Sequence, residues 1–183
     1  MALSATIYNL TIDLADIDRS VYETLELRVA RQPSETAEYM LVRVLAYCLE
    51  YREGIALTEG VAAGGEPAVI IRDLTGQTTA WIEVGMPDAA RVHRGSKLAG
   101  RVAIYTHRDV RQVLAQFAGE KVHKSEGIPV YAFARDFIDE VAGLIERRTA
   151  LSVSITEREL YVTIGDRTLT TTVEEHRLGQ AIG

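Results

Sequence analysis

The 183-residue chain is poor in the residues that build several common kinds of site. Its only cysteine is Cys48, so no disulfide can form within the chain, which fits a reducing compartment. The four histidines are scattered without the spacing of metal ligands, and there is no P-loop motif. With 20 Lys and Arg against 26 Asp and Glu, the net charge is −6. Nucleic acid would therefore need a local basic patch, because the overall field repels phosphate.

Long apolar runs are also missing, and none approaches the length of a membrane span. A content of 47% hydrophobic and 25% charged residues is typical of a soluble globular protein. The first residues carry no basic leader and are soon followed by three aspartates, which is unlike a secretory or transit peptide. We therefore expect a single domain over residues 1–183, cytoplasmic and without a membrane partner.

The order of the expected elements indicates an α/β fold. Alternating patterns predict an opening hairpin, and a mostly apolar helix with Ser34 as its N-cap follows and ends before Gly54. Strands and helices then alternate, and a β-meander closes the chain. We expect a mixed central sheet with additional antiparallel hairpins from both termini. The expected strands are 5–14, 21–30, 55–58, 68–73, 79–84, 102–105, 128–133, 151–156, 159–164 and 167–173, and the helices are 34–52, 88–99, 109–118 and 135–148.

Two carboxylates mark a candidate metal site. Asp73 ends one expected strand and Glu83 lies on the next, ten positions later. If the turn is centred near Thr78, the two residues lie opposite each other, with side chains converging within about 6 Å. They could then bind Mg²⁺, or Mn²⁺ in its place, which polarises a phosphoryl oxygen. If Gly76 and Gln77 form a two-residue turn instead, the pair separates. The alternative to a metal site is that Asp73 caps a loop and Glu83 is an ordinary exposed strand residue.

The helix after Glu83 carries a basic stripe. At 100° per residue, His93, Arg94, Lys97 and Arg101 fall on one side. This stripe follows directly after the carboxylates, so we expect it to face the same cleft, with Lys97 nearest and Arg94 as the second choice for contacting a phosphate. The alternative is a solvated basic face with no role in a site.

The first helix carries a polar stripe on an otherwise apolar surface. Glu35, Tyr39, Arg43 and Tyr47 recur every four residues, and Glu50 lies on the same side. One interpretation is a ladder of stabilising ion pairs. The other is the wall of a substrate site, with Glu35 or Glu50 as a third carboxylate, Arg43 on a phosphate and Tyr39 beside it. Cys48 lies on the apolar side of this helix and should be buried and unreactive.

Four segments together resemble the YaeQ family, and the likeness spans nearly the whole chain. The segments are YMLVRVLAY at 39–47, EPAVIIRDLTG at 66–76, WIEVGMPD at 81–88 and RVHRGSK at 91–97. The resemblance implies a variant of the PD-(D/E)XK nuclease fold, a superfamily in which an Asp and a Glu on adjacent strands bind Mg²⁺. Asp73 and Glu83 would take these two roles.

One position departs from that superfamily pattern. A lysine is expected two residues after the glutamate, and Gly85 stands there. Either Lys97 supplies the charge from the helix, or the site is inactive. The sequence therefore leaves two hypotheses: a Mg²⁺-dependent nuclease with Asp73, Glu83 and Lys97 as its catalytic residues, or a catalytically inactive binding or regulatory module. Family resemblance alone does not choose between them.

Overall fold

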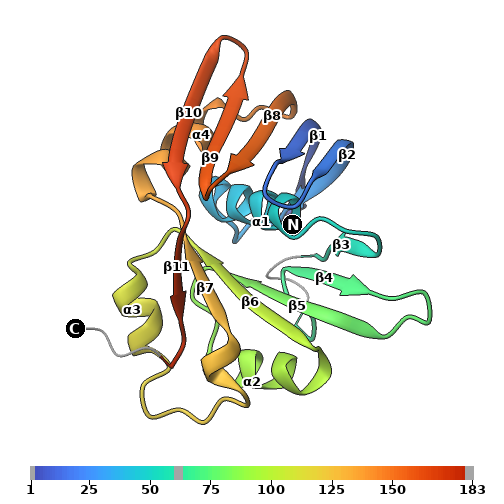
Figure 1. Cartoon of the computed structure of the whole chain (residues 1–183). Coiled ribbons are helices and arrows are strands. Elements are labelled where there is room, and N and C mark those ends of the chain that lie inside the picture. The colour runs from blue at the N-terminus through green and yellow to red at the C-terminus, as the bar shows by residue number, and fades with distance from the viewer. Residues whose placement is uncertain (1–2, 60–63, 180–183) are drawn as a thin grey trace.

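The computed structural model describes residues 3–59 and 64–179, which form two β-sheets and their helices (Figure 1). The first half contains β1 (Thr6–Asp16), β2 (Val21–Arg31), α1 (Ala37–Leu49), β3 (Ile55–Leu57), β4 (Val69–Arg72), β5 (Thr78–Val84), α2 (Ala89–Leu98) and β6 (Arg101–Thr106). The second half contains α3 (Val110–Ala115), a 3₁₀ turn η2 (Ser125–Gly127), β7 (Pro129–Ala132), α4 (Arg135–Leu144), β8 (Arg148–Thr156), β9 (Glu159–Ile164), β10 (Arg167–Thr172) and β11 (Glu174–Arg177).

The two ends of the chain build the first sheet together. Its strand order is β10-β9-β8-β1-β2, and β1 pairs in parallel with β8 while the other neighbours are antiparallel. Leu10, Ile12 and Leu14 of β1 are buried on one face, as the alternating pattern predicts. The terminal hairpins are therefore additional to the central sheet, as expected, but they pair with each other and form a sheet of their own and do not extend the central one.

The middle of the chain and the last strand, β11, build the second sheet. Its order is β11-β7-β6-β5-β4-β3, with parallel pairing across β5, β6 and β7 and antiparallel pairing elsewhere. The fold is thus mixed α/β with two mixed sheets. The expected helices and strands all form within a few residues of their predicted bounds, whereas η2 and β11 have no counterpart among the predictions.

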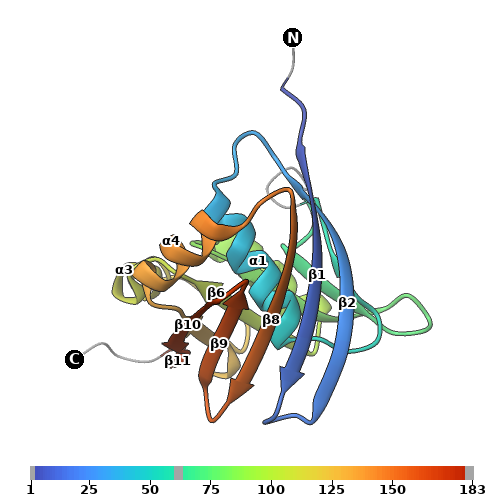
Figure 2. The ribbon, with the colours of Figure 1, turned by 90° about the horizontal axis from the view of Figure 1, so that it is seen from above.

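Helix α1 lies between the two sheets, and Figure 2 shows it beneath the strands of the first sheet. Its apolar residues pack in one core with side chains from both sheets. Leu41, Val44 and Leu45 are fully buried there, each contributing about 1.5–3 kcal/mol by leaving water. On the other face of the second sheet, α2 and α3 cover a smaller core around Trp81 and Ile104.

The ends of α1 differ slightly from the prediction. Thr36, not Ser34, is the N-cap, and its hydroxyl accepts a hydrogen bond from the Tyr39 backbone N–H at 3.0 Å. The helix ends at Leu49 with Glu50 as its C-cap, which turns the Glu50 side chain out of the helical register. No helix in residues 3–59 and 64–179 is long and apolar enough to cross a membrane.

Candidate functional site

Asp73 forms the corner of the β4–β5 turn. One of its carboxylate oxygens accepts hydrogen bonds from the Thr75 hydroxyl at 2.6 Å and from the backbone N–H groups of Thr75 and Gln77 at 2.9 and 3.0 Å. These bonds, led by the Thr75 hydroxyl, lower the pKa of Asp73, which is fully solvent-exposed. Asp73 is therefore a turn-stabilising residue, as the alternative interpretation of the sequence holds.

Glu83 lies at the opposite end of the same hairpin. About six residues of strand separate it from the turn, so the two carboxylates are roughly 20 Å apart. Its partner on β6 is Ile104, whose side chain offers no ligand atom, and the pairing of β5 with β4 ends at Ile82 and Val69. The predicted convergence of Asp73 and Glu83 is wrong. The chain turns at Asp73, and β5 places Glu83 at the far end of the hairpin.

Arg91 is the cation that contacts Glu83. It is the third residue of α2, which begins beside the end of β5, and its Nη2 and Nε atoms lie 3.3 and 3.4 Å from the two carboxylate oxygens. Trp81 Nε1 donates a shorter bond of 2.8 Å. Burial raises the pKa of Glu83, while Arg91 and Trp81 oppose that shift. Arg91 is not among the predicted site residues, although a first-turn residue after a short strand–helix loop must lie near the strand end.

Gly85 has a backbone conformation that excludes the lysine of the superfamily pattern. Its φ is +84°, in the left-handed region that side chains disfavour. A Cβ atom at this position would also lie 3.2 Å from the Tyr39 ring. A lysine here would thus be both strained and crowded, so the departure from the pattern is built into the fold.

The basic stripe of α2 does not face Glu83 as a unit. Gly95 packs directly on the Trp81 ring, which fixes the helix against β5. Lys97 lies in the last turn, close to His123, and not beside Glu83. Arg94 points toward Gly65, and Arg101 belongs to β6. The expectation that Lys97 is nearest to the carboxylates is therefore wrong, because α2 runs away from the strand end that carries Glu83.

Glu35 and Arg43 form a buried ion pair. Arg43 Nε donates to Glu35 at 2.7 Å and Nη2 donates at 3.1 Å, and both side chains are almost inaccessible. The remaining guanidinium bonds go to the backbone carbonyls of Ala30 and Thr58. Arg43 has no free face for a phosphate, so the predicted substrate role of this pair does not fit the geometry. Tyr39 lies next to the pair, and burial followed by the Glu83 charge raises its pKa to about 12.

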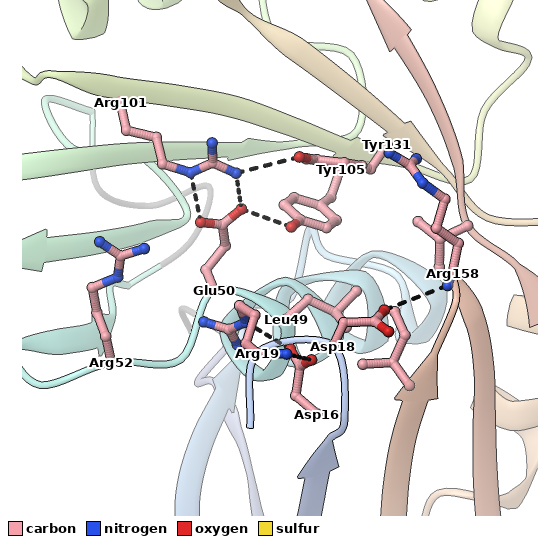
Figure 3. Close-up of a pocket in the computed structure, with 12 residues that line it drawn as sticks. Asp16, Asp18, Arg19, Leu49, Glu50, Arg52, Arg101, Tyr105, Tyr131 and Arg158 are labelled. Atoms are coloured by element: carbon pink, nitrogen blue, oxygen red, sulfur yellow. Dashed lines mark hydrogen bonds and ion pairs between the residues drawn. The ribbon is translucent and has the colours of Figure 1, made fainter. Parts of the chain in front are cut away.

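Glu50, the other glutamate of the α1 stripe, lies in a different place. It borders a cavity of about 460 Å³ between the two sheets, which we call the inter-sheet pocket (Figure 3). The pocket gathers residues from strands, turns and helix ends that are far apart in the sequence. They are Asp16, Asp18, Arg19, Leu49, Glu50, Arg52, Arg101, Tyr105, Tyr131, Ile155, Arg158 and Val173.

Arg101 and Tyr105 fix the Glu50 carboxylate at one wall of the pocket. Arg101 binds it through two bonds of 2.8 and 2.7 Å, and the Tyr105 hydroxyl donates a third of 2.7 Å. Burial and the Glu50 charge raise the pKa of Tyr105, and its ring stacks on Tyr131 with 4.8 Å between centroids. Three short hydrogen bonds therefore hold the Glu50 carboxylate in place.

The opposite side of the pocket carries two turns that are tied together. Arg19 donates to Asp16 at 2.6 Å and to carbonyls at the end of α1. Asp18 accepts the backbone N–H groups of the β8–β9 turn, including that of Arg158 at 3.5 Å. Arg158 itself pairs with Glu175. Among the described residues, Arg52 is the pocket arginine that forms no ion pair.

Cys48 is fully buried, as predicted, and burial raises the pKa of its thiol to about 12. Its lack of reactivity stays a prediction. No group of three or more His, Cys, Asp or Glu side chains within residues 3–59 and 64–179 is arranged to hold a metal ion.

Known proteins resemble this chain over most of its length. A family model described as "YaeQ protein" matches residues 1–173. The "Uncharacterized protein YaeQ" of Escherichia coli (strain K12) is 31% identical over 163 residues, which cover 88% of this chain and 90% of that protein. The crystal structure of YaeQ protein from Pseudomonas syringae has a TM-score of 0.85 at 30% identity and covers 93% of this chain and 95% of its own. The YaeQ protein from Xanthomonas axonopodis pv. citri has the same TM-score at 25% identity, with 94% and 98% covered.

Proposed function

The chain belongs to the YaeQ family, and we propose that it is a binding module that holds a small organic acid in the inter-sheet pocket. The observation that carries this proposal is the pocket itself. Its volume of about 460 Å³ lies within the range of small-molecule sites, and its polar groups are held in place by short hydrogen bonds.

The charge of the pocket favours a singly charged anion. Four arginines and three carboxylates line it, so a multiply charged ligand would meet repulsion from the fixed acidic groups. Arg52 is the arginine left without an ion pair among the described residues, and it is our candidate for the acid group. Leu49, Ile155 and Val173 supply an apolar wall for the body of the ligand.

The residues around Glu83 do not fit the Mg²⁺ ion of the nuclease hypothesis. A hard cation needs several oxygen ligands at short range. Asp73 lies at the other end of the hairpin, and the partner of Glu83 on β6 is Ile104. Asp88 acts on Glu83 but caps α2 through the Arg91 N–H, and Arg91 already contacts the glutamate. We therefore derive no metal-dependent step and favour the inactive-module hypothesis.

Two measurements test this proposal. In a thermal-shift and calorimetric screen of mono- and dicarboxylic acids, we expect a monocarboxylate with an apolar body to bind. Arg52→Gln should weaken that binding by roughly tenfold or more, as for the loss of one charged hydrogen bond, while Arg94→Gln, remote from the pocket, should not.

The second measurement is a cleavage assay with DNA and RNA in Mg²⁺ or Mn²⁺. We expect no cleavage. Metal-dependent cleavage that disappears in Glu83→Gln would overturn the proposal in favour of a nuclease, and so would binding of every acid without sensitivity to Arg52.

A further inference from the structure

A second cavity, of about 220 Å³, lies where the end of α2 meets the segment before β7. We call it the basic cavity. The net charge of the chain is −6, yet no carboxylate is among the residues that line this cavity. They are Ser96, Ala99, Gly100, Arg101, Val102, His123, Lys124, Gly127 and Ile128. Local charge, not net charge, decides which ligand such a site attracts.

The charged groups that face His123 are all basic. His93 and Lys97 approach it from α2, and Lys124 adjoins it in the same loop. Desolvation, followed by these three groups, lowers the pKa of His123. Neither Lys97 nor Lys124 forms an ion pair with any described residue. The site therefore gathers positive charge that the protein leaves uncompensated.

His93 is oriented as a hydrogen-bond donor. Its Nδ1 atom accepts the backbone N–H of His123 at 3.1 Å, so the proton of the neutral ring is on Nε2. The same bond ties the loop to α2 and holds the two histidines together.

The nearby acidic residues point elsewhere. Glu50 binds the guanidinium of Arg101 from the inter-sheet pocket, on the other face of β6. Glu126 lies in the loop, but its side chain faces Gly179. A ligand in the basic cavity would thus meet cations and N–H donors and no carboxylate among its lining residues.

We propose that the basic cavity binds a phosphate group. Lys124 and His123 line the cavity and would contact the oxygens. Lys97 and His93 lie beside the cavity, where Lys97 would add positive charge and His93 holds the backbone of His123. This site is separate from the organic-acid pocket and does not depend on its occupancy, although Arg101 lines both cavities. A phosphate site here would also give a function to the basic stripe of α2, which does not face Glu83 as a unit.

Titration with inorganic phosphate, followed by NMR of the histidine rings at constant ionic strength, tests this site. We expect the His93 and His123 signals to shift, and the pKa of His123 to rise, because a bound anion favours the charged imidazolium. The double variant K97Q/K124Q should weaken phosphate binding by at least about tenfold. Lys121→Gln removes an exposed lysine that neither lines the cavity nor acts on His123, so binding should be unchanged, as it should be in Arg52→Gln of the inter-sheet pocket.

The source of the phosphate group is separated by two further probes. If the natural ligand is a nucleic-acid backbone, a thymidine oligonucleotide should bind more tightly than inorganic phosphate and with the same dependence on Lys97 and Lys124. If it is a free phosphate or a phosphate monoester, a mononucleotide should match the oligonucleotide. Unchanged histidine signals in phosphate, or binding that survives K97Q/K124Q in a folded protein, would overturn the assignment.

Discussion

Two buried glutamates, Glu83 and Glu50, have the same accessibility and different surroundings. Each is 3% exposed, each contacts one arginine, and each lies where a strand meets a helix end. Arg101 binds Glu50 with two short bonds of 2.8 and 2.7 Å. Arg91 reaches Glu83 only at 3.4 and 3.3 Å, and the same Nη2 atom donates a shorter bond of 2.8 Å to the Glu66 carbonyl.

The difference shows that a carboxylate at a strand end is not by itself a site. Glu83 has the sequence position that the nuclease pattern requires, but its partners are the Trp81 indole at 2.8 Å and an arginine at longer range, and it borders neither the inter-sheet pocket nor the basic cavity. Glu50 has no such position, yet three short hydrogen bonds hold it and it borders a cavity. The residues that surround each carboxylate, which come from segments far apart in the sequence, decide whether it can belong to a binding site.

The largest expected effect concerns a third buried glutamate, Glu35, and its ion pair with Arg43. Arg43→Ala leaves Glu35 buried without its partner, and the free energy of unfolding should fall by about 3–5 kcal/mol. Urea denaturation measures this loss. The double variant E35Q/R43M removes both charges and should recover much of it. A single-variant loss below about 1 kcal/mol would mean that the pair is solvated in solution.

A direct comparison of the two arginines should give the next largest effect. Arg101→Ala breaks two short bonds to Glu50, so we expect a loss of about 2–3 kcal/mol in unfolding free energy. Arg91→Ala breaks longer contacts and should cost about 1 kcal/mol or less. Chemical denaturation of both variants under identical conditions tests the order. Equal losses of unfolding free energy in the two variants would mean that Glu50 and Glu83 are bound equally strongly by their arginines.

Gly85→Ala should destabilise the protein by about 1–2 kcal/mol, because alanine is strained at positive φ and its Cβ would crowd Tyr39. Gly76→Ala is a matched control: Gly76 also has positive φ, but open space surrounds it, so its cost should be smaller. Differential scanning calorimetry compares the two. A stable Gly85→Lys protein that gains metal-dependent cleavage would contradict our reading of this position.

The smallest expected effect is a pH dependence at Glu83. Its raised pKa means that the folded state holds the proton more tightly than the unfolded state does. The contribution of this group to stability therefore falls as the pH rises from about 4 through the raised pKa. Wild type should lose stability relative to Glu83→Gln across that window in urea titrations. The opposite trend would show that Arg91 dominates over burial.

Much of the local structure is predictable from the sequence, because it depends on neighbouring residues. Apolar alternation marks β1 and β2, and Asp88 caps α2 within one residue of the expected start. The position of Asp73 is not predictable in this way. A register shift between Ile71 and Arg72 and three hydrogen bonds in the turn decide it, and periodicity carries no information on either.

For the site residues too, local features are predictable from the sequence, whereas contacts between distant segments are not. Sequence reasoning selects Glu50 as a possible third carboxylate, but its partners Arg101 and Tyr105 lie more than fifty residues further along the chain. Only the packing of α1 against β6 brings them together. For Lys97 the opposite holds. The basic stripe on α2 is predictable from the sequence, but the direction of the helix places Lys97 away from Glu83.

The parallel pairing of β1 with β8 has a consequence for how the chain is made. The β1–β2 hairpin leaves the ribosome early, whereas β8 begins only at Arg148. Until then the inner edge of β1 has no partner, and an isolated two-stranded hairpin is at most marginally stable. Closure of this sheet is therefore a late, long-range folding step. A chain interrupted before β8 would expose an apolar strand edge, which is a target for chaperones and for aggregation.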